Sequence, residues 1–465
     1  MTATLTPPLR SGRSAVAAIG LLAVATGALE SVVTPTLPLL QRELRMSPSE
    51  GALLSVMLLI TGALVTPLAG RFGDRCGGRR VLVRLMAVVS VGGLVSAAAP
   101  NLPVLLLGQV LQGAMVGALP LSFILVRDHL PAAESKVAIG TVSGLFVAGG
   151  MAGTLAAGPV AEGLSRHWMF ALPTGAVIVA TAWVHRLLPP DPPRDTADTG
   201  IDWAGLLLLS GALGTLMAVL ARLPQLRSQP LLLGLLIAAT VGCAIGWVAV
   251  ERRAVAPLVD LRLLVRPAVW KACALTFVMC VGTSAAVYLV PQLLAAPTDA
   301  YGFGASATEI GFYLLPGVVA ASLAGPLSGA WARRQGPRAQ VTTGSALMVA
   351  ALLALAAVHT EIWHLVVGKL LIALANGLCV TAMVTSTATA VEHRETGIAT
   401  GLVLVTRVVG YAVGVQISGA LLTAGTPAGS AVPAESAFVT GFAVAAVVTA
   451  LSLFVARTLT KGVAE

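Results

Sequence analysis

The sequence predicts an all-α integral membrane protein with fourteen membrane-spanning helices. Hydrophobic residues make up 57% of the 465 residues and charged residues only 11%, against roughly 45–50% and about 25% in a soluble domain. Apolar runs of about 20 residues recur along the chain, each long enough to cross a hydrocarbon layer of ~30 Å as a helix. The runs do not alternate in polarity as barrel strands do, so helices are the conformation that satisfies their backbone polar groups in lipid.

The spans are bounded by charged residues or by clusters of proline and glycine. The first span is too long for the core of a signal peptide and contains Glu30, so we expect a permanent helix there. The longest hydrophilic segment, 189–202, is too short to fold as a soluble domain, and we expect no enzyme activity, no cofactor and no metal site. The predicted spans are 14–37, 50–70, 81–99, 102–125, 138–163, 170–188, 203–222, 230–250, 270–292, 308–331, 341–358, 362–385, 398–422 and 437–457.

Charge placement predicts the orientation in the membrane. The net charge is +9, yet the basic residues lie in short loops between spans, which is the pattern of membrane topology and not of a nucleic-acid partner. With the N-terminus inside, Lys369 and Arg407 fall within helices, and the outside receives only Arg42, Arg45, Arg166, Arg222 and Arg227. We therefore expect both termini in the cytoplasm. The scarcity of lysine beside abundant alanine, glycine and valine suggests a bacterial chain, hence the inner (cytoplasmic) membrane.

The chain resembles itself at an offset of about 260 residues, which indicates an internal repeat. The segment 70–77 matches 329–336, and 105–109 matches 365–369. Four glycines of one span, Gly140, Gly149, Gly153 and Gly158, match Gly401, Gly410, Gly414 and Gly419 in the same order.

This repeat predicts three parts. An N-terminal six-helix half occupies 1–190, a linker with two inserted transmembrane helices occupies 191–268, and a C-terminal six-helix half occupies 269–465. The inserted helices carry few polar residues, which favours packing against lipid. Two membrane halves around a central site are the architecture of alternating access, in which one half rocks against the other.

The segment after the second span carries glycines and charges at fixed spacing. From Gly70 to Arg79 it reads Gly-Arg-Phe-Gly-Asp-Arg-Cys-Gly-Gly-Arg, which resembles the cytoplasmic signature of the major facilitator superfamily. Nearly the whole chain resembles the fourteen-helix drug:proton antiporters of that superfamily, which implies the major facilitator fold. In the second half Arg333 stands at the aspartate position of the signature. The resemblance implies that the glycines permit a tight turn and that the charges latch neighbouring helix ends, which assigns a conformational latch to Gly70, Asp74, Arg75, Gly77 and Arg79.

The span at 138–163 is similar to the antiporter signature helix of this family, although Thr154 and Glu162 replace two of its expected glycines. Small residues four apart let helices approach closely, and proline can bend a helix. Generic close packing would produce the same pattern. The residues that carry the resemblance are Gly149, Gly150, Gly153, Gly158 and Pro159.

Ionisable groups inside membrane helices cost about 2.5–3.5 kcal/mol on insertion scales, so each of them marks a functional hypothesis. Glu30 lies near the outer end of the first span, in a stretch similar to the family's opening motif, and we expect Thr26 and Thr34 one turn away on its face. Lys369 lies at similar depth in the twelfth span. Its repeat mate Gln109 stands where the family usually has a basic residue, which puts the family's usual coupling scheme in doubt.

The resemblance implies that the first and fourth helices of each half line a central cavity, which would bring Glu30, Gln109, Tyr288 and Lys369 together. Our hypothesis is that Glu30 and Lys369 form the proton-coupling pair, because burial and a nearby cation act in opposite directions on a carboxyl group. The alternative for Lys369 is an anchor whose ammonium group reaches the interface. Helix packing is an alternative for Asn376 and Arg407. The candidates for the cavity or the substrate are Thr26, Thr34, Gln109, Gln112, Tyr288, Asn376, Arg407 and Tyr411.

The sequence has no Gly-x-x-x-x-Gly-Lys-Ser/Thr phosphate loop, which argues against an ATP-driven pump. We expect a monomeric, proton-coupled secondary transporter that exports amphipathic drugs, antibiotics or a related metabolite by alternating access. Its expected partners are a small amphipathic substrate, protons and the lipid bilayer. The alternatives are a lipid, siderophore or small-nutrient transporter of the same fold or, from a different class, a membrane receptor or assembly partner that does not transport.

Overall fold

The computed structural model describes residues 10–129, 131–188, 191, 203–223, 229–253, 261–390, 396–427, 429–430 and 432–457. Every regular element in these ranges is a helix. Thirteen helical segments in the described part of the chain are long and apolar enough to cross a membrane, and a bent pair makes up to fourteen. The predicted all-α membrane fold is confirmed.

The helices follow the predicted spans closely. In chain order they are α1 (Arg10–Ser31), α2 (Val33–Leu44), α3 (Pro48–Cys76), α4 (Gly78–Ala97), α5 (Leu102–Gln112), the 3₁₀ helix η1 (Gly113–Gly117), α6 (Ala118–His129), α7 (Ala132–Gly163), α8 (Arg166–Leu187), α9 (Trp203–Arg222), α10 (Pro230–Glu251), α11 (Leu261–Leu264), α12 (Pro267–Ala295), α13 (Ala307–Ala357), α14 (Ile362–Ala390), α15 (Thr396–Ala424) and α16 (Glu435–Arg457).

The first span is bent. Its two parts, α1 and α2, meet at an angle of 41° after Ser31. Pro35 has no N–H to donate to the carbonyl group of Ser31, so the helix loses a hydrogen bond at this point and kinks. The helical path then continues to Leu44, beyond the predicted end at residue 37.

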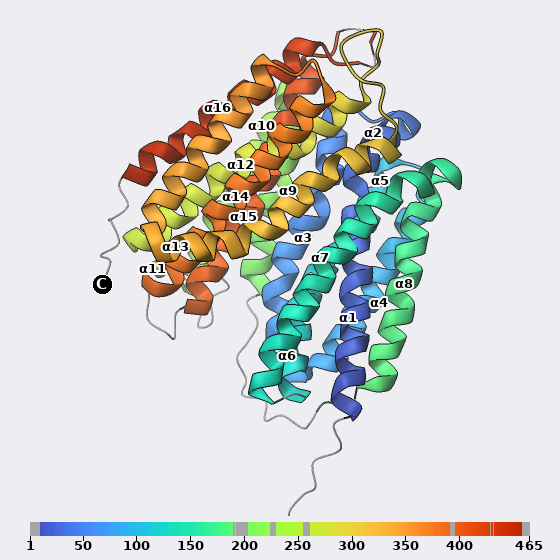
Figure 1. The fold of residues 1–465 in the computed structure, drawn as a ribbon, viewed down its shortest axis with the longest axis vertical. Coiled ribbons are helices and arrows are strands. Elements are labelled where there is room, and N and C mark those ends of the chain that lie inside the picture. Colours follow the sequence, from blue (N-terminus) through green and yellow to red (C-terminus); the bar gives the residue numbers. More distant parts are fainter. Residues whose placement is uncertain are drawn as a thin grey trace, which may run out of the picture. The chain divides into compact units, whose positions relative to one another are not determined.

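The contacts divide the chain into two compact units. The first unit comprises Met1–Thr36 and Met57–Asp198, and the second comprises Leu37–Val56 and Thr199–Glu465. In the first unit α1 packs against α7 and α8, and α4 packs against α5 and α8 (Figure 1). The apolar core of this unit includes the fully buried side chains of Leu22, Leu82, Met86, Leu121 and Val177.

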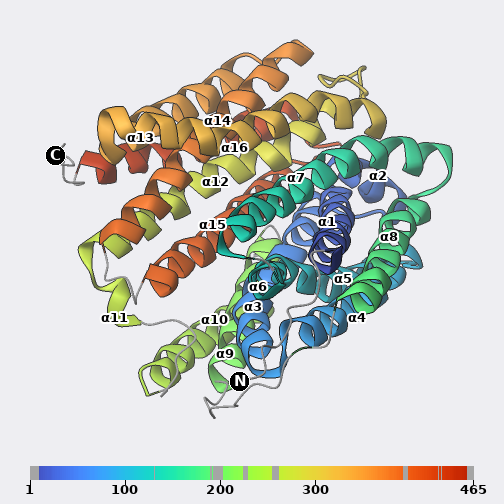
Figure 2. The ribbon, with the colours of Figure 1, turned by 60° about the horizontal axis from the view of Figure 1, so that its bottom comes forward.

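In the second unit α12 packs against α14, α15 and α16, and α13 packs against α14 and α16 (Figure 2). The long helix α13 carries two spans, and the Gln340 side chain donates a hydrogen bond to the carbonyl oxygen of Ser328 at 2.5 Å. Residues 12 apart in a straight helix would be about 18 Å apart, so the chain reverses between them.

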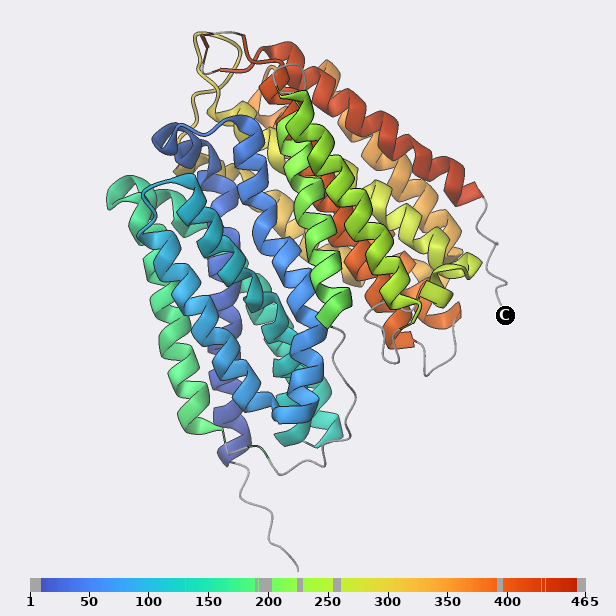
Figure 3. The ribbon, with the colours of Figure 1, turned by 180° about the vertical axis from the view of Figure 1, so that it is seen from behind.

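The inserted helices α9 and α10 lie side by side in this unit (green in Figure 3), and α9 also packs against α15. Thr240 of α10 donates a hydrogen bond to Thr215 of α9 at 2.9 Å. Most of α10 remains exposed, with Leu231 at 77% and Ile245 at 65%, as expected for a helix that faces lipid.

The internal repeat is visible in the packing of equivalent glycines. In the first unit a Cβ atom on Gly153 of α7 would lie 2.7 Å from Ala28 Cα of α1. In the second unit a Cβ atom on the repeat mate Gly414 of α15 would lie 2.6 Å from the Val281 carbonyl oxygen of α12. In each unit, therefore, the fifth helix of the repeat packs on the backbone of the first at a position where only glycine fits.

Candidate functional site

Lys369 is held in the interior of the second unit. It lies in α14, and only 8% of its surface is exposed. Its aliphatic stem packs on Gly317 of α13, where a Cβ atom would lie 3.1 Å from Lys369 Cγ. Within the residues that the structure describes, its ammonium group has no hydrogen-bond or ion-pair partner. A buried charge is costly unless it is paired, so the position of Lys369 requires an explanation, and both roles considered for it remain predictions.

A polar cluster lies two turns further along α14. Asn376 is half-buried, and Cys280 of α12 donates a weak S–H bond to its side-chain oxygen at 3.9 Å. Arg407 of α15 is in electrostatic range of the Cys280 thiol. Arg407 is exposed although it lies about two turns inside the span Ala399–Ala424, and such a position is costly against lipid. We therefore expect Arg407 to line an aqueous cavity, with the half-buried Tyr411 one turn further along α15.

Gln109 occupies the equivalent position of the first unit. Like Lys369, it is a buried polar residue whose side-chain nitrogen has no partner among the described atoms. It lies in α5, is 1% exposed, and its amide nitrogen Nε2 is buried without a hydrogen-bond partner among the described atoms. Gln112, one turn later, donates to the Ser96 hydroxyl at 2.6 Å and so ties α5 to α4. This contact gives Gln112 a packing role, whereas the sequence placed it among the cavity candidates.

The span that contains Gln109 is not a uniform α-helix, because η1 separates α5 from α6. A Cβ atom on Gly113, at the start of η1, would lie 2.6 Å from the carbonyl oxygen of Leu58 in α3. A short 3₁₀ stretch inside a helix often marks a hinge. Because α3 approaches this closely, the first residue of η1 has to be a glycine.

Glu30 is half-buried in the last turn of α1. Thr26 lies one turn before it, but its hydroxyl donates to the carbonyl oxygens of Leu22 and Ala23 at 2.8 and 3.1 Å, so it serves its own helix. Thr34 lies beyond the bend, so the expected i+4 relation to Glu30, which requires one straight helix, is wrong. Glu30 and Lys369 belong to different units, and their pairing remains a prediction.

Tyr288 lies in a hydrogen-bonded cluster that the sequence did not predict. We call Gln41, Arg42, Tyr288 and Gln292 the Gln41 clasp. Gln41 of α2 donates to the Tyr288 hydroxyl at 3.3 Å and accepts from the Gln292 amide, while Tyr288 donates to the carbonyl oxygen of Pro48. Arg42 donates to the carbonyl oxygen of Ala295 at 3.3 Å. Tyr288 is only 2% exposed, so its hydroxyl joins α12 to the junction of α2 and α3.

The first turn of α3 extends this contact to α15. The backbone N–H of Ser49 donates to the Thr423 hydroxyl at 2.9 Å, and Gln416 donates to the Ser49 carbonyl oxygen at 3.4 Å. A Cβ atom on Gly419 would lie 2.5 Å from Ala52 Cβ. The predicted outer ends of the first two spans thus form part of the second unit through contacts that join residues at least 240 positions apart.

The predicted latch is organised by a residue that the sequence analysis missed. The carboxylate of Asp191 accepts the backbone N–H groups of Arg79 and Arg80 at 2.9 and 3.0 Å, which caps the N-terminus of α4. Arg79 also donates to the carbonyl oxygen of His185. An aspartate at a helix N-terminus satisfies free N–H groups and complements the helix dipole. No local signal reveals it, because Asp191 lies 112 residues from Arg79.

The glycines of the latch have different roles. Gly77 has φ +95°, in the left-handed region that favours glycine, and forms the turn between α3 and α4. Gly70 lies inside α3 with open space around its Cα, so the tight-turn role expected for it is wrong. The side chains of Asp74, Arg75 and Arg333 lie outside the described atoms.

The remaining residues of the predicted antiporter helix lie in α7. Gly149 packs on the backbone of Val24, and Gly158 is buried. Pro159 lies inside the helix, which continues past it to Gly163. Gly149 and Gly153 therefore account for the close approach of α1 and α7.

The family of the chain follows from a match to a protein-family profile. The profile of the Major Facilitator Superfamily matches residues 19–293 and 272–464, which together cover most of the chain. The chain belongs to this superfamily. It is therefore a multi-pass membrane protein of the major facilitator fold, as the signature between Gly70 and Arg79 suggested.

Curated relatives within the superfamily carry several names. The chain is 28% identical over 412 residues to an uncharacterised MFS-type transporter of Mycobacterium tuberculosis, covering 86% of this chain and 58% of that protein. It is 32% identical over 302 residues to the multidrug resistance protein B homolog of the same species, covering 62% and 53%. A triacylglyceride transporter of Mycolicibacterium smegmatis is 27% identical over 453 residues, covering 88% and 76%. The chain thus spans little more than half the length of the Mycobacterium tuberculosis relatives.

Solved structures agree on the major facilitator fold. A bacterial homolog of the human lysosomal transporter Spinster, in an inward-facing and unoccupied conformation, matches with a TM-score of 0.67. The alignment covers 97% of this chain and 96% of that chain at 15% identity. At this identity the likeness supports the fold alone.

Proposed function

We propose that this transporter couples proton movement to the export of amphipathic compounds by alternating access. The observation that carries the proposal is Lys369, which is 92% buried in α14 without a partner among the described residues. A buried amine of this kind can relieve its desolvation by releasing a proton or by receiving an anionic group. A group that alternates between these states is what an exchanger of protons and substrate requires.

The polar cluster of Asn376, Cys280 and Arg407 supplies the substrate contacts in this proposal. Asn376 follows Lys369 by seven positions on one helix, which is about 10 Å along its axis. A substrate with a polar end near Arg407 and an apolar body between the helices fits this spacing. Arginine remains charged at every relevant pH, so Arg407 selects substrate while Lys369 changes state.

The export of drugs or antibiotics is favoured by the relative named as a multidrug resistance protein. Lipid transport is the second candidate, because the relative named as a triacylglyceride transporter aligns over a larger share of both chains. We further propose that the chain resides as a monomer in a bacterial inner membrane with both termini in the cytoplasm, as the basic loops predict.

Efflux from cells that express the chain tests the proposal. Cells are loaded with ethidium, a lipophilic cation, or with a fluorescent amphipathic anion, and efflux is recorded with and without a protonophore. The variants are Glu30→Gln and Lys369→Gln, with Lys271→Gln as the matched control. Lys271 lies at the beginning of α12, with its ammonium group 6.0 Å from the Trp270 ring centroid.

The proposal predicts protonophore-sensitive efflux in the wild type and in Lys271→Gln, with loss in Lys369→Gln. Efflux in Lys369→Gln that keeps its protonophore sensitivity would contradict the role of this lysine. Efflux of neither dye beside transport of a long-chain acylglycerol would favour the lipid alternative.

A further inference from the structure

Two charged side chains lie deep inside the described membrane spans of the second unit, and both are cations. Lys369 follows the first residue of the span Ile362–Thr387 by seven positions, and Arg407 follows the first residue of Ala399–Ala424 by eight. The acidic residues in the described spans of this unit all lie within three residues of a span end. They are Glu43, Glu50, Glu251, Glu309 and Glu435. The described interior of the second unit therefore carries positive charge that its own spans do not neutralise.

Neither cation is paired with a residue that the structure describes. Lys369 is 8% exposed, and its ammonium group has no hydrogen-bond or ion-pair partner in the described ranges. Arg407 likewise forms no hydrogen bond or ion pair with any described residue, although it is in electrostatic range of the Cys280 thiol. A charge inside a membrane protein is costly without a counter-charge. Both positions therefore fit a negatively charged group that comes from a ligand.

A polar path connects the two cations. Asn376 follows Lys369 by seven positions, nearly two full turns, so it lies on the same face of α14 about 10 Å further along. The Asn376 side-chain oxygen accepts the weak S–H bond of Cys280 in α12, and the Cys280 thiol is in electrostatic range of Arg407 in α15. Asn376 and Arg407 thus lie around one residue of α12, and Lys369 lies two turns beyond Asn376.

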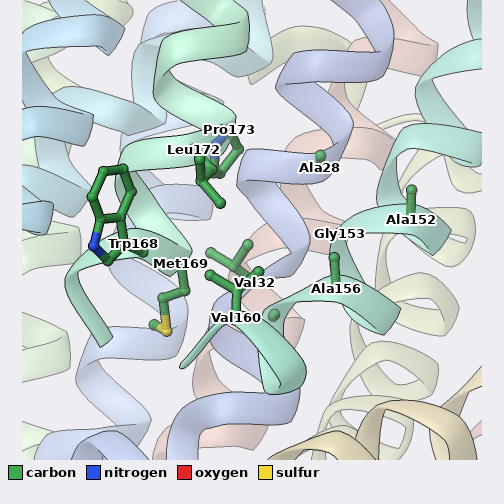
Figure 4. A pocket seen from close by; sticks show the side chains of 11 residues that line it. Ala28, Val32, Ala152, Gly153, Ala156, Val160, Trp168, Met169, Leu172 and Pro173 are labelled. Atoms are coloured by element: carbon green, nitrogen blue, oxygen red, sulfur yellow. The ribbon is translucent and has the colours of Figure 1, made fainter. Parts of the chain in front are cut away.

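An apolar pocket of the first unit provides the contrast. It has a volume of about 200 Å³ between α1, α7 and α8, and Figure 4 shows Trp168 and Met169 of α8 and Val160 of α7 among its lining side chains. None of its lining residues is ionisable. This pocket has no counter-charge for an anion, whereas the polar path of the second unit has one at each end.

We propose that the substrates of this transporter are amphipathic anions, with a carboxylate, sulfonate or phosphate group that Arg407 and then Lys369 bind. The inference rests on the proposed function and names its substrate class. Arginine binds such groups through two parallel N–H bonds, and lysine binds them as a point charge. A cationic substrate would meet two like charges along the same path, which disfavours it.

The positions of the two cations set the order of binding. In the predicted orientation Arg407 lies toward the cytoplasmic end of its span, and Lys369 lies toward the outer end of its own. The anion therefore binds Arg407 first and reaches Lys369 later, past Asn376. Substitution of Lys369 should for this reason stop transport without abolishing the initial binding.

Binding of two matched probes tests the substrate class. The full chain is purified in phosphatidylcholine nanodiscs and titrated with dansylaminoundecanoic acid, and energy transfer from the tryptophans of the protein to the dansyl group records binding. Empty nanodiscs give the background. The second probe carries a trimethylammonium group in place of the carboxylate on the same hydrocarbon chain. We expect the anion to bind at least about tenfold more tightly than the cation.

Four variants make the result specific. Arg407→Gln should weaken binding of the anion at least about tenfold, and Arg407→Lys should weaken it less because the charge remains. Arg252→Gln changes an exposed arginine outside the spans and should bind as the wild type does. Lys369→Gln should keep most of the binding. Equal or tighter binding of the cationic probe, or unchanged anion binding in Arg407→Gln, would overturn the proposal.

Transport in liposomes distinguishes this inference from the proposed function. The wild type is reconstituted, and movement of the dansyl anion is followed with and without an imposed pH gradient. We expect the gradient to accelerate it. Anion transport that does not respond to the gradient would contradict proton coupling while supporting the anion assignment. Gradient-driven transport of the cationic probe in preference to the anion would overturn the anion assignment alone.

Discussion

The contact between α1 and α7 and the contact between α12 and α15 are two copies of one packing arrangement. The two units differ in the polar residues that they carry at equivalent positions. Gly153 and Gly414 occupy equivalent places and bring each helix pair to backbone contact. The equivalent polar positions differ, with Gln109 in the first unit and Lys369 in the second. The repeat therefore preserves how the helices pack, while the polar residues at equivalent positions differ between the two units.

The largest effect is expected from adding a methyl group at equivalent glycines that lie against the backbone of the neighbouring helix in both copies. Gly153→Ala and Gly414→Ala each force backbones apart, so we expect a loss of about 2–4 kcal/mol in the free energy of unfolding. Thermal unfolding of the purified protein in detergent measures it. The repeat mates Gly140 and Gly401 have open space around their Cα atoms, and alanine there should be neutral or slightly stabilising. Equal effects at all four sites would contradict the shared packing.

Exchange of the unlike polar residues tests whether the chemistry belongs to one unit. Gln109→Lys places an ammonium group in a site where the amide is already 99% buried, at a cost of about 2–3 kcal/mol in stability. The double variant Gln109→Lys/Lys369→Gln moves the lysine to the first unit. We expect it to fold but to lose proton-coupled transport at least about 100-fold, a deficit of ~2.7 kcal/mol. Retained coupling would show that either repeat position can carry it.

The spans were predictable from the sequence because length and hydropathy decide what a bilayer can hold, and Gly149 and Gly153 were predictable as packing residues because small-residue spacing is local. Long-range contacts were not. Tyr288 was expected in the cavity, yet its hydroxyl donates to Pro48, 240 residues away. Asp191 lies in a proline-rich segment whose pattern gives no hint of the helix it caps.

The Gln41 clasp has no counterpart in the sequence prediction, because it lies in the second unit and includes a segment that the sequence assigns to the first half. Tyr288→Phe removes the donor to Pro48 and the acceptor for Gln41, at about 1–1.5 kcal/mol for the lost hydrogen bonding. We expect the buried Ala52 to become accessible about five- to tenfold more often. Labelling of Ala52→Cys by an impermeant maleimide in a Cys76→Ser background measures this. Tyr313→Phe is the control. Equal labelling rates with and without Tyr288→Phe would show that the Gln41 clasp does not restrict access to this position.

A smaller effect on stability is expected at the N-terminal cap of α4, which belongs to the predicted latch of the first unit. Asp191→Ala removes both acceptors of the Arg79 and Arg80 N–H groups, with an expected loss of about 1 kcal/mol. Asp191→Asn retains one acceptor and should lose less. Thermal unfolding orders the three proteins. A loss in Asp191→Asn as large as that in Asp191→Ala would assign the effect to charge and not to capping.

The most direct test of the central claim is proton movement measured with the purified protein in liposomes. A pH-sensitive dye inside the vesicles records protons released or taken up when a transported substrate is added outside, for the wild type, Lys369→Gln and Lys271→Gln. We expect a substrate-driven proton signal in the wild type and in Lys271→Gln, and none in Lys369→Gln although that variant folds and binds substrate. A full proton signal in Lys369→Gln would contradict it.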